Sequence, residues 1–196
     1  MSPGVPDGPE VLRQDALQLL SSWMAPDAAQ EQLRTAYVAH LRLRPDGVLR
    51  SCLPGHLTTG ALVLSDDAEH VLLNLHRKAG RWFHFGGHLE PTDASVVGAA
   101  HREAVEESGL AGLEVEPVPL HLSSHVVDFC GGRDQVTHLD VRFLALAPRS
   151  REPQVSEESL AVRWWPVDAL PTQEPDMVEM VAAAVARVSG RTDLAI

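Results

Sequence analysis

Three glutamates, Glu103, Glu106 and Glu107, fall within five residues near the end of the stretch GGHLEPTDASVVGAAHREAVEESGL, which begins at Gly86. Residues three and four positions apart are neighbours on a helix, so the three carboxylates would share one face. Like charges at this spacing repel each other unless a cation lies among them. Clustered hard oxygen ligands suit Mg²⁺ or Mn²⁺ better than zinc. The spacing therefore predicts a magnesium or manganese site.

The residues around the glutamates fit the same chemistry. Glycine lets the backbone turn sharply and approach a ligand closely, so Gly86-Gly87 can offer carbonyls to a metal or amides to phosphate oxygens. Arg102 precedes the first glutamate, where it can orient a carboxylate or contact a phosphate. The alternative is that Glu106-Glu107 is only a solvated surface patch, which is the usual meaning of an isolated acidic pair on a helix.

The order of these residues resembles the Nudix hydrolase signature, G-x5-E-x7-R-E-U-x-E-E-x-G-U, in which U is a bulky apolar residue. Here it occurs as Gly87, Asp93 and the run Arg102–Leu110. The chain departs from the signature in four ways. Asp93 replaces the first glutamate, eight residues instead of seven separate it from Arg102, Thr92 stands where a glycine is usual, and Ala104 is small for its position. The departures put the role of Asp93 in doubt and leave the metal-binding half intact.

The resemblance implies metal-dependent hydrolysis of a diphosphate linkage in a substrate of the type nucleoside diphosphate-X. The implied metal ligands are the Gly87 carbonyl, Glu103, Glu106 and Glu107, with Mg²⁺ or Mn²⁺ as cofactor. Arg102 would orient Glu103, Asp93 would brace Arg102, and Glu90 would touch the waters of the metal. The catalytic base is either Glu103, the first choice, or Glu157 or Glu158 on a distal polar loop.

Residues near the glycine pair are the candidates for substrate binding. Arg81, His84 and His88 would line a basic pocket, joined by Arg142 from a later strand, and Trp82 or Trp164 would reach a base. His125, His138 and Asp140 lie on strands after the signature, where a histidine is more often structural than a ligand. A histidine–zinc site is the weaker metal hypothesis, because no helix carries the H-E-x-x-H spacing.

Two other functions are compatible with the resemblance. A Nudix domain can sense a ligand without cleaving it, although such domains usually lose the signature glutamates that this chain keeps. An enzyme similar to isopentenyl-diphosphate isomerase would need a catalytic cysteine beside the site, and neither Cys52 nor Cys130 has an obvious place there. The identity of X stays open.

Composition restricts the partners of the 196-residue chain. Its net charge of −11 disfavours general nucleic-acid binding, which needs a basic surface. We expect no membrane segment, because no apolar run approaches spanning length. Two cysteines are too few for a disulfide scaffold and indicate a reducing cytoplasm. The expected partner is a small diphosphate substrate, and a homodimer is possible.

Apolar periodicity predicts the helices and strands of an α/β fold and an N-terminal helical hairpin. The resemblance implies that the elements after the hairpin form a Nudix-type α/β/α sandwich with a mixed sheet. We divide the chain into this helical extension, 1–50, and a Nudix domain, 51–196. We call the helix that carries Glu103, Glu106 and Glu107 the glutamate helix, and Thr92 or Asp93 is expected to cap it. Asp27, with Gln30 in the capping-box position, is expected to cap the second helix of the hairpin. Helices are expected over 9–24, around Leu33, Tyr37 and Leu41, over 94–108 and from Pro175 onward, and strands over 58–65, 70–77, 81–85, 118–129, 136–147 and 159–165.

Overall fold

The computed structural model describes residues 8–128, 130, 135–157 and 159–192. They form two compact units. The first unit takes its described residues from Met1–Thr59, His88–Ala99 and Leu122–Val141, and the second from Gly60–Gly87, Ala100–His121 and Arg142–Ile196. The segment 131–134, between two predicted strands, and the candidate base Glu158 lie outside the described residues.

Strand β2 (His70–His76) is the centre of the antiparallel pairing in the second unit. It pairs with β1 (Gly55–Ser65), β3 (Arg81–Phe83) and β8 (Ser159–Pro166), and Leu72 lies opposite both Val63 of β1 and Trp164 of β8. The four residues from Val71 to Asn74 are all buried, which explains why this segment is a continuous apolar run with a single amide at its end.

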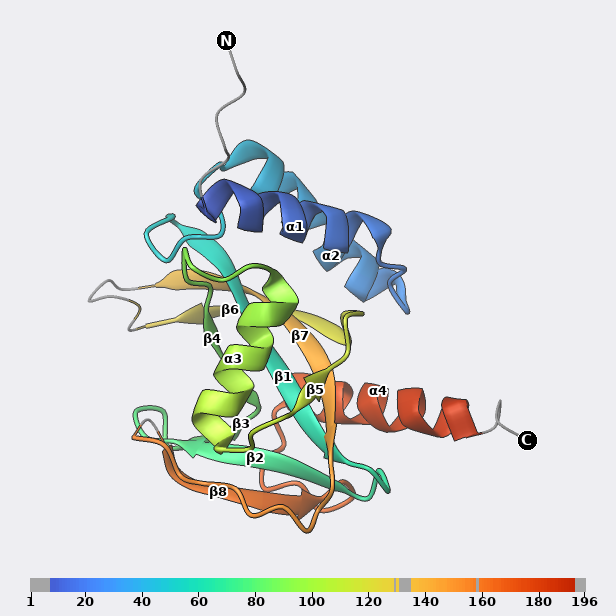
Figure 1. Cartoon of the computed structure of the whole chain (residues 1–196). Coiled ribbons are helices and arrows are strands. Elements are labelled where there is room, and N and C mark those ends of the chain that lie inside the picture. Colours follow the sequence, from blue (N-terminus) through green and yellow to red (C-terminus); the bar gives the residue numbers. More distant parts are fainter. Residues whose placement is uncertain (1–7, 129, 131–134, 158, 193–196) are drawn as a thin grey trace. The chain divides into compact units, whose positions relative to one another are not determined.

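The remaining strands make the sheet mixed. In the first unit, Gly55 lies against Thr137 and the Thr59 hydroxyl donates to the Val141 carbonyl at 3.0 Å, so β1 and β7 (Val136–Ala147) advance in the same direction (Figure 1). β4 (Phe85–His88) pairs with β1, and β5 (Glu114–Val115) and β6 (His121–Val127) pair with β7. The predicted mixed sheet is thereby confirmed.

Alternation along β1 creates two apolar clusters in the second unit, because successive side chains of a strand point to opposite faces. Ala61 and Val63 pack in one cluster with Ala104 of helix α3 (Val96–Ser108). Leu62 and Leu64 pack in the other cluster with residues of helix α4 (Pro175–Thr192). Helices therefore cover both faces of these strands, as the predicted α/β/α arrangement requires.

The N-terminal hairpin consists of α1 (Gly8–Ser22) and α2 (Ala28–Leu43), as predicted. Asp27 caps α2 by accepting from the Gln30 amide nitrogen at 2.8 Å. The Gln30 side chain does not take the reciprocal bond of a capping box. It pairs instead with the backbone of Leu122, donating to the carbonyl at 3.1 Å and accepting from the N–H at 2.7 Å.

The hairpin also caps α3 in the first unit. Asp15 of α1 accepts from the backbone N–H of Val96 at 2.7 Å, which places a carboxylate at the first turn, where the helix dipole favours negative charge. Ser95 accepts from the Gly98 N–H at 3.0 Å. The prediction that Thr92 or Asp93 caps this helix was therefore wrong, because the helix begins at Val96, two residues later than expected, and Ser95 occupies the cap.

Three other boundaries differ from the predictions. β1 begins at Gly55 instead of Thr58, and the predicted strand 81–85 divides at His84 into β3 and β4. The two-residue strand β5 was not predicted, because it is too short to show alternation. Among the described residues, no helix has the length and hydropathy needed to cross a membrane.

Candidate functional site

Glu107 connects the glutamate helix to the glycine pair within the second unit. Its side chain is almost entirely buried, with 7% of the residue exposed. One carboxylate oxygen accepts from the Gly86 N–H at 3.0 Å and from the Asn74 amide at 3.3 Å. These donors favour the charged carboxylate despite its burial. Glu107 is therefore fixed in place before any ligand arrives.

Glu103 lies directly against Gly87. A methyl group in place of the glycine hydrogen would come within 2.7 Å of one carboxylate oxygen and 2.8 Å of the other. Only glycine permits this close approach of the carboxylate to the backbone. The Glu103 carboxylate therefore lies beside the Gly87 backbone, and the role of the two as metal ligands stays a prediction.

Arg102 supplies positive charge beside the helix. Its Nη1 lies 2.8 Å from a Glu103 oxygen and 3.3 Å from a Glu106 oxygen. The Glu103 pair is mostly shielded from solvent, whereas 60% of the Glu106 side chain is exposed. Because exposed ion pairs contribute little free energy, Glu106 can turn away from Arg102 at small cost. The guanidinium holds Glu103 and reduces the repulsion among the carboxylates.

The end of the glutamate helix depends on the last glycine of the signature. Gly109 has a φ of +69°, and a Cβ there would lie 2.5 Å from the Gln154 side chain. The Gln154 N–H donates to the Ser108 carbonyl at 2.8 Å, which satisfies a carbonyl that the helix leaves without a partner. The role of Gly109 in this structure is to end the helix and admit the loop that follows.

The predicted substrate residues of the second unit lie in different surroundings. Arg81 is exposed and pairs with Glu174 at 3.0 Å. Trp82 packs with Trp165 against the apolar cluster under α4, with ring centroids 5.1 Å apart. Trp164 lies beside the cluster under α3. The His84 ring occupies the space left by the missing side chain of Gly60.

Arg142 and His121 form a charged group with helix α4. Arg142, predicted to join a basic pocket, is buried and lies 2.6 Å from Asp176. The ring nitrogens of His121 lie 3.9 Å from Asp176 and from Glu179. Burial lowers the pKa of His121, and the Arg142 charge acts in the same direction. Arg142 is therefore held by an acidic partner.

The other acidic candidates differ in the unit to which they belong and in their exposure. Asp93 and Glu90 belong to the first unit, where the Asp93 carboxylate accepts from the Glu90 N–H at 2.7 Å. Glu157 of the polar loop is exposed, and its carbonyl accepts from Arg77. Asp140 is buried and accepts from Thr58 at 3.0 Å. Among these, only Glu157 has an exposed carboxylate in the second unit.

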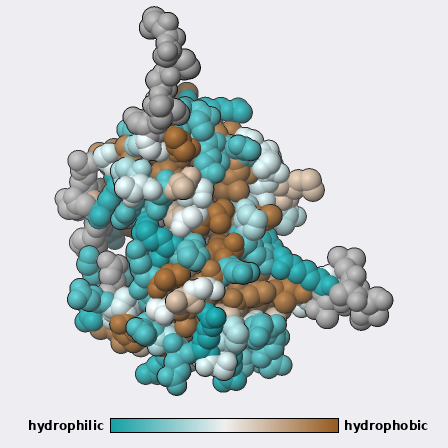
Figure 2. Space-filling view, viewed as in Figure 1, coloured by the Kyte–Doolittle hydropathy of each residue, from teal (hydrophilic) through white to brown (hydrophobic). Residues whose placement is uncertain are grey.

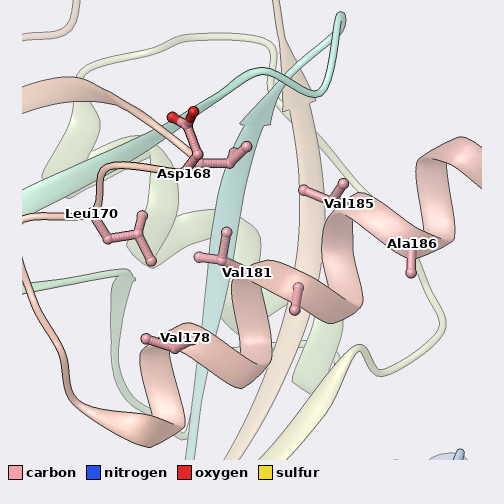
Figure 3. A pocket seen from close by; sticks show the side chains of 8 residues that line it. Asp168, Leu170, Val178, Val181, Val185 and Ala186 are labelled. Carbon is pink, nitrogen blue, oxygen red and sulfur yellow. The ribbon is translucent and has the colours of Figure 1, made fainter.

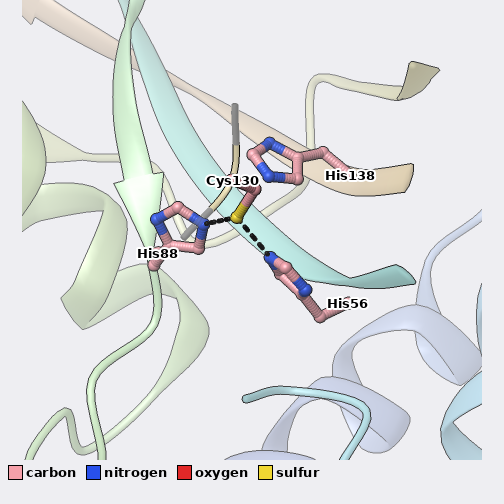
Figure 4. Close-up of side chains that lie close together, drawn as sticks. All are labelled: His56, His88, Cys130 and His138. Atoms are coloured by element: carbon pink, nitrogen blue, oxygen red, sulfur yellow. Dashed lines mark hydrogen bonds between the residues drawn. The ribbon is translucent and has the colours of Figure 1, made fainter. Parts of the chain in front are cut away.

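A second group of metal-type side chains lies entirely in the first unit. We call it the Cys-His cluster, and its members are His56, His88, Cys130 and His138, each of which has one ligand atom within 4.8 Å of those of the others (Figure 4). Burial lowers the pKa of His88 to about 4 and that of His138 to about 3, and it also lowers the pKa of His56. All three imidazoles are therefore neutral near pH 7.

Sequence reasoning considered His88 and His138 separately, weighed Cys130 only as a catalytic cysteine and did not single out His56. Cys130 lies 74 positions from His56 and 42 from His88, so no local motif could reveal the group. The structure brings His88 to His138, whereas His125, the other strand histidine considered, is exposed at the edge of the cluster and faces His138 at a centroid distance of 5.6 Å.

An apolar groove of about 400 Å³ lies along helix α4 in the second unit (Figure 3). Asp168 supplies the one charged side chain of its lining, which otherwise consists of Val, Leu and Ala. Brown apolar side chains also run along α4 in the space-filling view (Figure 2). The lining offers no cation to a diphosphate, so this groove is a poor candidate for the anion site.

Comparisons with known proteins support the interpretation of residues 87–110 as a Nudix signature. A family model described as the NUDIX domain matches residues 54–184. No curated protein sequence matches the chain. Among solved structures, a C. elegans Ap4A hydrolase binary complex aligns with a TM-score of 0.54 at 17% identity, covering 68% of this chain and 98% of that one.

A second solved structure gives the same fold. The E. coli dihydroneopterin triphosphate pyrophosphohydrolase aligns with a TM-score of 0.54 at 18% identity, covering 67% of this chain and 95% of that one. At these identities the structural likeness establishes the fold alone. The family model covers well over half of the chain and includes both the glycine pair and the glutamate helix. The chain therefore belongs to the Nudix family and is a hydrolase that acts on phosphoanhydrides.

Proposed function

We propose that the protein hydrolyses the diphosphate linkage of a nucleoside diphosphate-X substrate and that it requires Mg²⁺ or Mn²⁺. The observation that carries the proposal is that side chains of the glutamate helix contact the Gly86-Gly87 pair. Glu107 accepts from the Gly86 N–H, and Glu103 lies against Gly87 in a space that only glycine leaves open. Two glycines of β4 and two carboxylates of the helix are thus held together before a ligand binds.

The residues present fit a hard divalent cation. Glu103, Glu106, Glu107 and the Gly87 carbonyl offer only oxygen donors, which Mg²⁺ and Mn²⁺ prefer. Three carboxylates on one helix face carry more negative charge than the single guanidinium of Arg102 neutralises. When bound, the ion would neutralise phosphate oxygens and activate an attacking water.

The side chains of the site have separate roles in positioning the carboxylates and in accepting a proton. Arg102 holds Glu103, which we assign as the general base that accepts the proton of the attacking water. Asn74 and the Gly86 N–H hold Glu107 in its charged form. Glu157 is the second candidate for the base, because its carboxylate lies on an exposed loop of the same unit.

We propose Arg81, His84 and Trp82 for substrate binding, whereas His88, also predicted for this role, is a member of the Cys-His cluster. The Arg81–Glu174 pair is solvent-exposed on both sides, so a phosphate can replace Glu174 as the partner of the guanidinium at little cost. If Arg81 binds substrate in this way, Arg81→Ala raises KM more than it lowers kcat. An unchanged KM would show that the guanidinium only pairs with Glu174.

The test is a panel of nucleoside diphosphate sugars, dinucleoside polyphosphates and nucleoside triphosphates, each incubated with the protein and Mg²⁺ and separated by ion-exchange chromatography. Hydrolysis of a diphosphate yields two phosphorylated products and stops when the metal is chelated. Tight binding of a nucleotide without products would favour the ligand-sensing alternative. An isomerised diphosphate of unchanged mass would favour the isomerase alternative.

We further propose that the helical extension, 1–50, braces the Nudix domain, 51–196. Gln30 and Tyr37 bond the backbone of β6, and Asp15 caps the helix that carries the glutamates. A chain that starts at Pro54 should therefore lose stability and activity. If it stays as stable, monodisperse and active as the full chain, the hairpin has another role. Light scattering on both chains measures whether the hairpin also mediates a homodimer.

A further inference from the structure

We propose that the Cys-His cluster is a binding site for zinc or a similar transition metal, with His56, His88, Cys130 and His138 as its ligands. This site would be chemically different from the magnesium site of the glutamate helix. A thiolate and three imidazoles are soft or borderline ligands, which select zinc, whereas carboxylates and carbonyls select magnesium. None of the four residues belongs to the glutamate helix.

The distances suit tetrahedral coordination. The Cys130 sulfur lies 3.3 Å from His88 Nε2 and 3.8 Å from His56 Nε2. Zinc–sulfur and zinc–nitrogen bonds of ~2.3 and ~2.05 Å at tetrahedral angles separate sulfur from nitrogen by ~3.6 Å. The two observed separations fall on either side of this value. Small side-chain movements would complete the shell, since all four ligand atoms already lie within 4.8 Å of one another.

The tautomer of His56 is fixed in the form that a metal needs. His56 Nδ1 lies 3.2 Å from the backbone carbonyl of Cys52, and a carbonyl oxygen can only accept, so Nδ1 carries the proton. In the neutral ring the lone pair is then on Nε2, the atom that faces Cys130. Ligating histidines usually donate their other N–H to a carbonyl or carboxylate in this manner.

His138 provides an independent observation. Its Nε2 is buried, and it has no hydrogen-bond partner among the described residues. A buried polar atom without a partner is destabilising, so a ligand at this nitrogen would be favoured. The ring of His138 lies about equally close to those of His56 and His88, with centroids 5.0 and 5.1 Å away. A metal among the three rings would satisfy this nitrogen.

The backbone holds the ligands on regular structure. His56 lies in β1, His88 at the end of β4 and His138 in β7, and the side chains converge on Cys130 (Figure 4). A second group, Asp67, Glu69 and His70, also has its ligand atoms close together, but its two carboxylates are exposed at a turn and it contains no thiol.

The first experiment measures metal content. The full-length protein is produced with added zinc and dialysed, and its zinc content is measured by elemental mass spectrometry. We expect about one zinc per chain in the wild type and a loss of at least tenfold in Cys130→Ser and His138→Gln. Cys52→Ser and His125→Gln are matched controls, one for each residue type, and should keep the metal. Full retention by Cys130→Ser would overturn the proposal.

The second experiment does not depend on whether the variants fold. Wild-type protein stripped of metal is titrated with Co²⁺ alone. A tetrahedral site with one thiolate gives a sulfur-to-cobalt charge-transfer band and intense visible bands, which excess Zn²⁺ should abolish. Weak octahedral bands alone, with no zinc retained in the first experiment, would show that the four side chains form only a buried polar cluster.

Discussion

The glutamate helix and the Cys-His cluster are two groups of potential metal ligands built in opposite ways. Glu103, Glu106 and Glu107 lie within one helical turn and a half, and their partners come from a loop shortly before the helix. The ligands of the Cys-His cluster extend from His56 to His138 and come from three strands and a separate segment. One group is local in sequence, and the other exists only because strands pair.

The difference extends to electrostatics. The glutamate helix concentrates negative charge, which Arg102 only partly offsets. In the Cys-His cluster, His56 and Cys130 are buried and His88 and His138 are partly buried, and burial lowers the pKa of each histidine. A charged oxygen site attracts a hard cation that remains partly hydrated and can exchange, whereas a buried neutral site suits a metal that stays bound. The first arrangement is suited to catalysis and the second to structure.

The largest expected effect is the loss of turnover when Glu107 of the glutamate helix is replaced, a change that should leave the Cys-His cluster intact. Glu107→Gln removes a charge and almost no volume, so the fold should survive while turnover falls at least ~100-fold, which corresponds to ~3 kcal/mol of transition-state stabilisation. Turnover, Mn²⁺ affinity and the thermal midpoint are measured on the same samples.

Glu114→Gln, an exposed change in the same unit, is the control for Glu107→Gln and should leave turnover unchanged. The zinc content of the Cys-His cluster should be unaffected by either substitution. Wild-type turnover and Mn²⁺ affinity in Glu107→Gln would show that the glutamates are only a surface patch.

A smaller effect is expected from Gly87→Ala, which tests whether the close approach of backbone and carboxylate matters. The new Cβ would lie 2.7 Å from a Glu103 oxygen, so the flexible carboxylate must move while the backbone stays. We expect turnover to fall by roughly tenfold, or ~1.4 kcal/mol, with little change in the thermal midpoint. Gly190→Ala is the control, since a Cβ there meets nothing within 4 Å. Equal turnover in both variants would contradict the prediction.

Tyr37→Phe tests the first unit without touching the glutamate helix. The Tyr37 hydroxyl donates to the buried Ser123 carbonyl at 2.5 Å, and losing this donor should lower the free energy of unfolding by about 1–3 kcal/mol. Urea denaturation measures the loss, and Thr35→Ala, an exposed change on the same helix, is the control. A loss as small as that of the control would show that the hairpin is held by other contacts.

The smallest effect concerns pH and His121. Burial and Arg142 lower the pKa of His121 in the folded state, while Asp176 and Glu179 oppose the shift and His84 adds to it. The unfolded chain therefore binds more protons just below pH ~6.5, so this histidine's contribution to stability is complete above that pH and is lost as the pH falls. Denaturation at several pH values should show a flatter dependence in His121→Gln. An identical dependence in both proteins would assign the titration to other groups.

Much of the candidate site could be predicted from the sequence, because its residues are close in the chain. The spacing of Glu103, Glu106 and Glu107 on a helix determines a shared face whatever the rest of the molecule does. Alternation of apolar residues in the same way determined that β1 and β7 are strands and which of their side chains are buried together. The family follows from the same short-range pattern.

Only the tertiary structure decided which distant residues meet. In the structure, Asp15 and Ser95 cap α3. The Gln30 side chain bonds β6 instead of its own helix, and Arg142 pairs with Asp176. The tertiary structure also gathered three histidines and a cysteine that no motif connects. The physical reason is that helix and strand periodicities act over a few residues, whereas strand pairing and helix packing bring together positions whose separation in the chain carries no pattern.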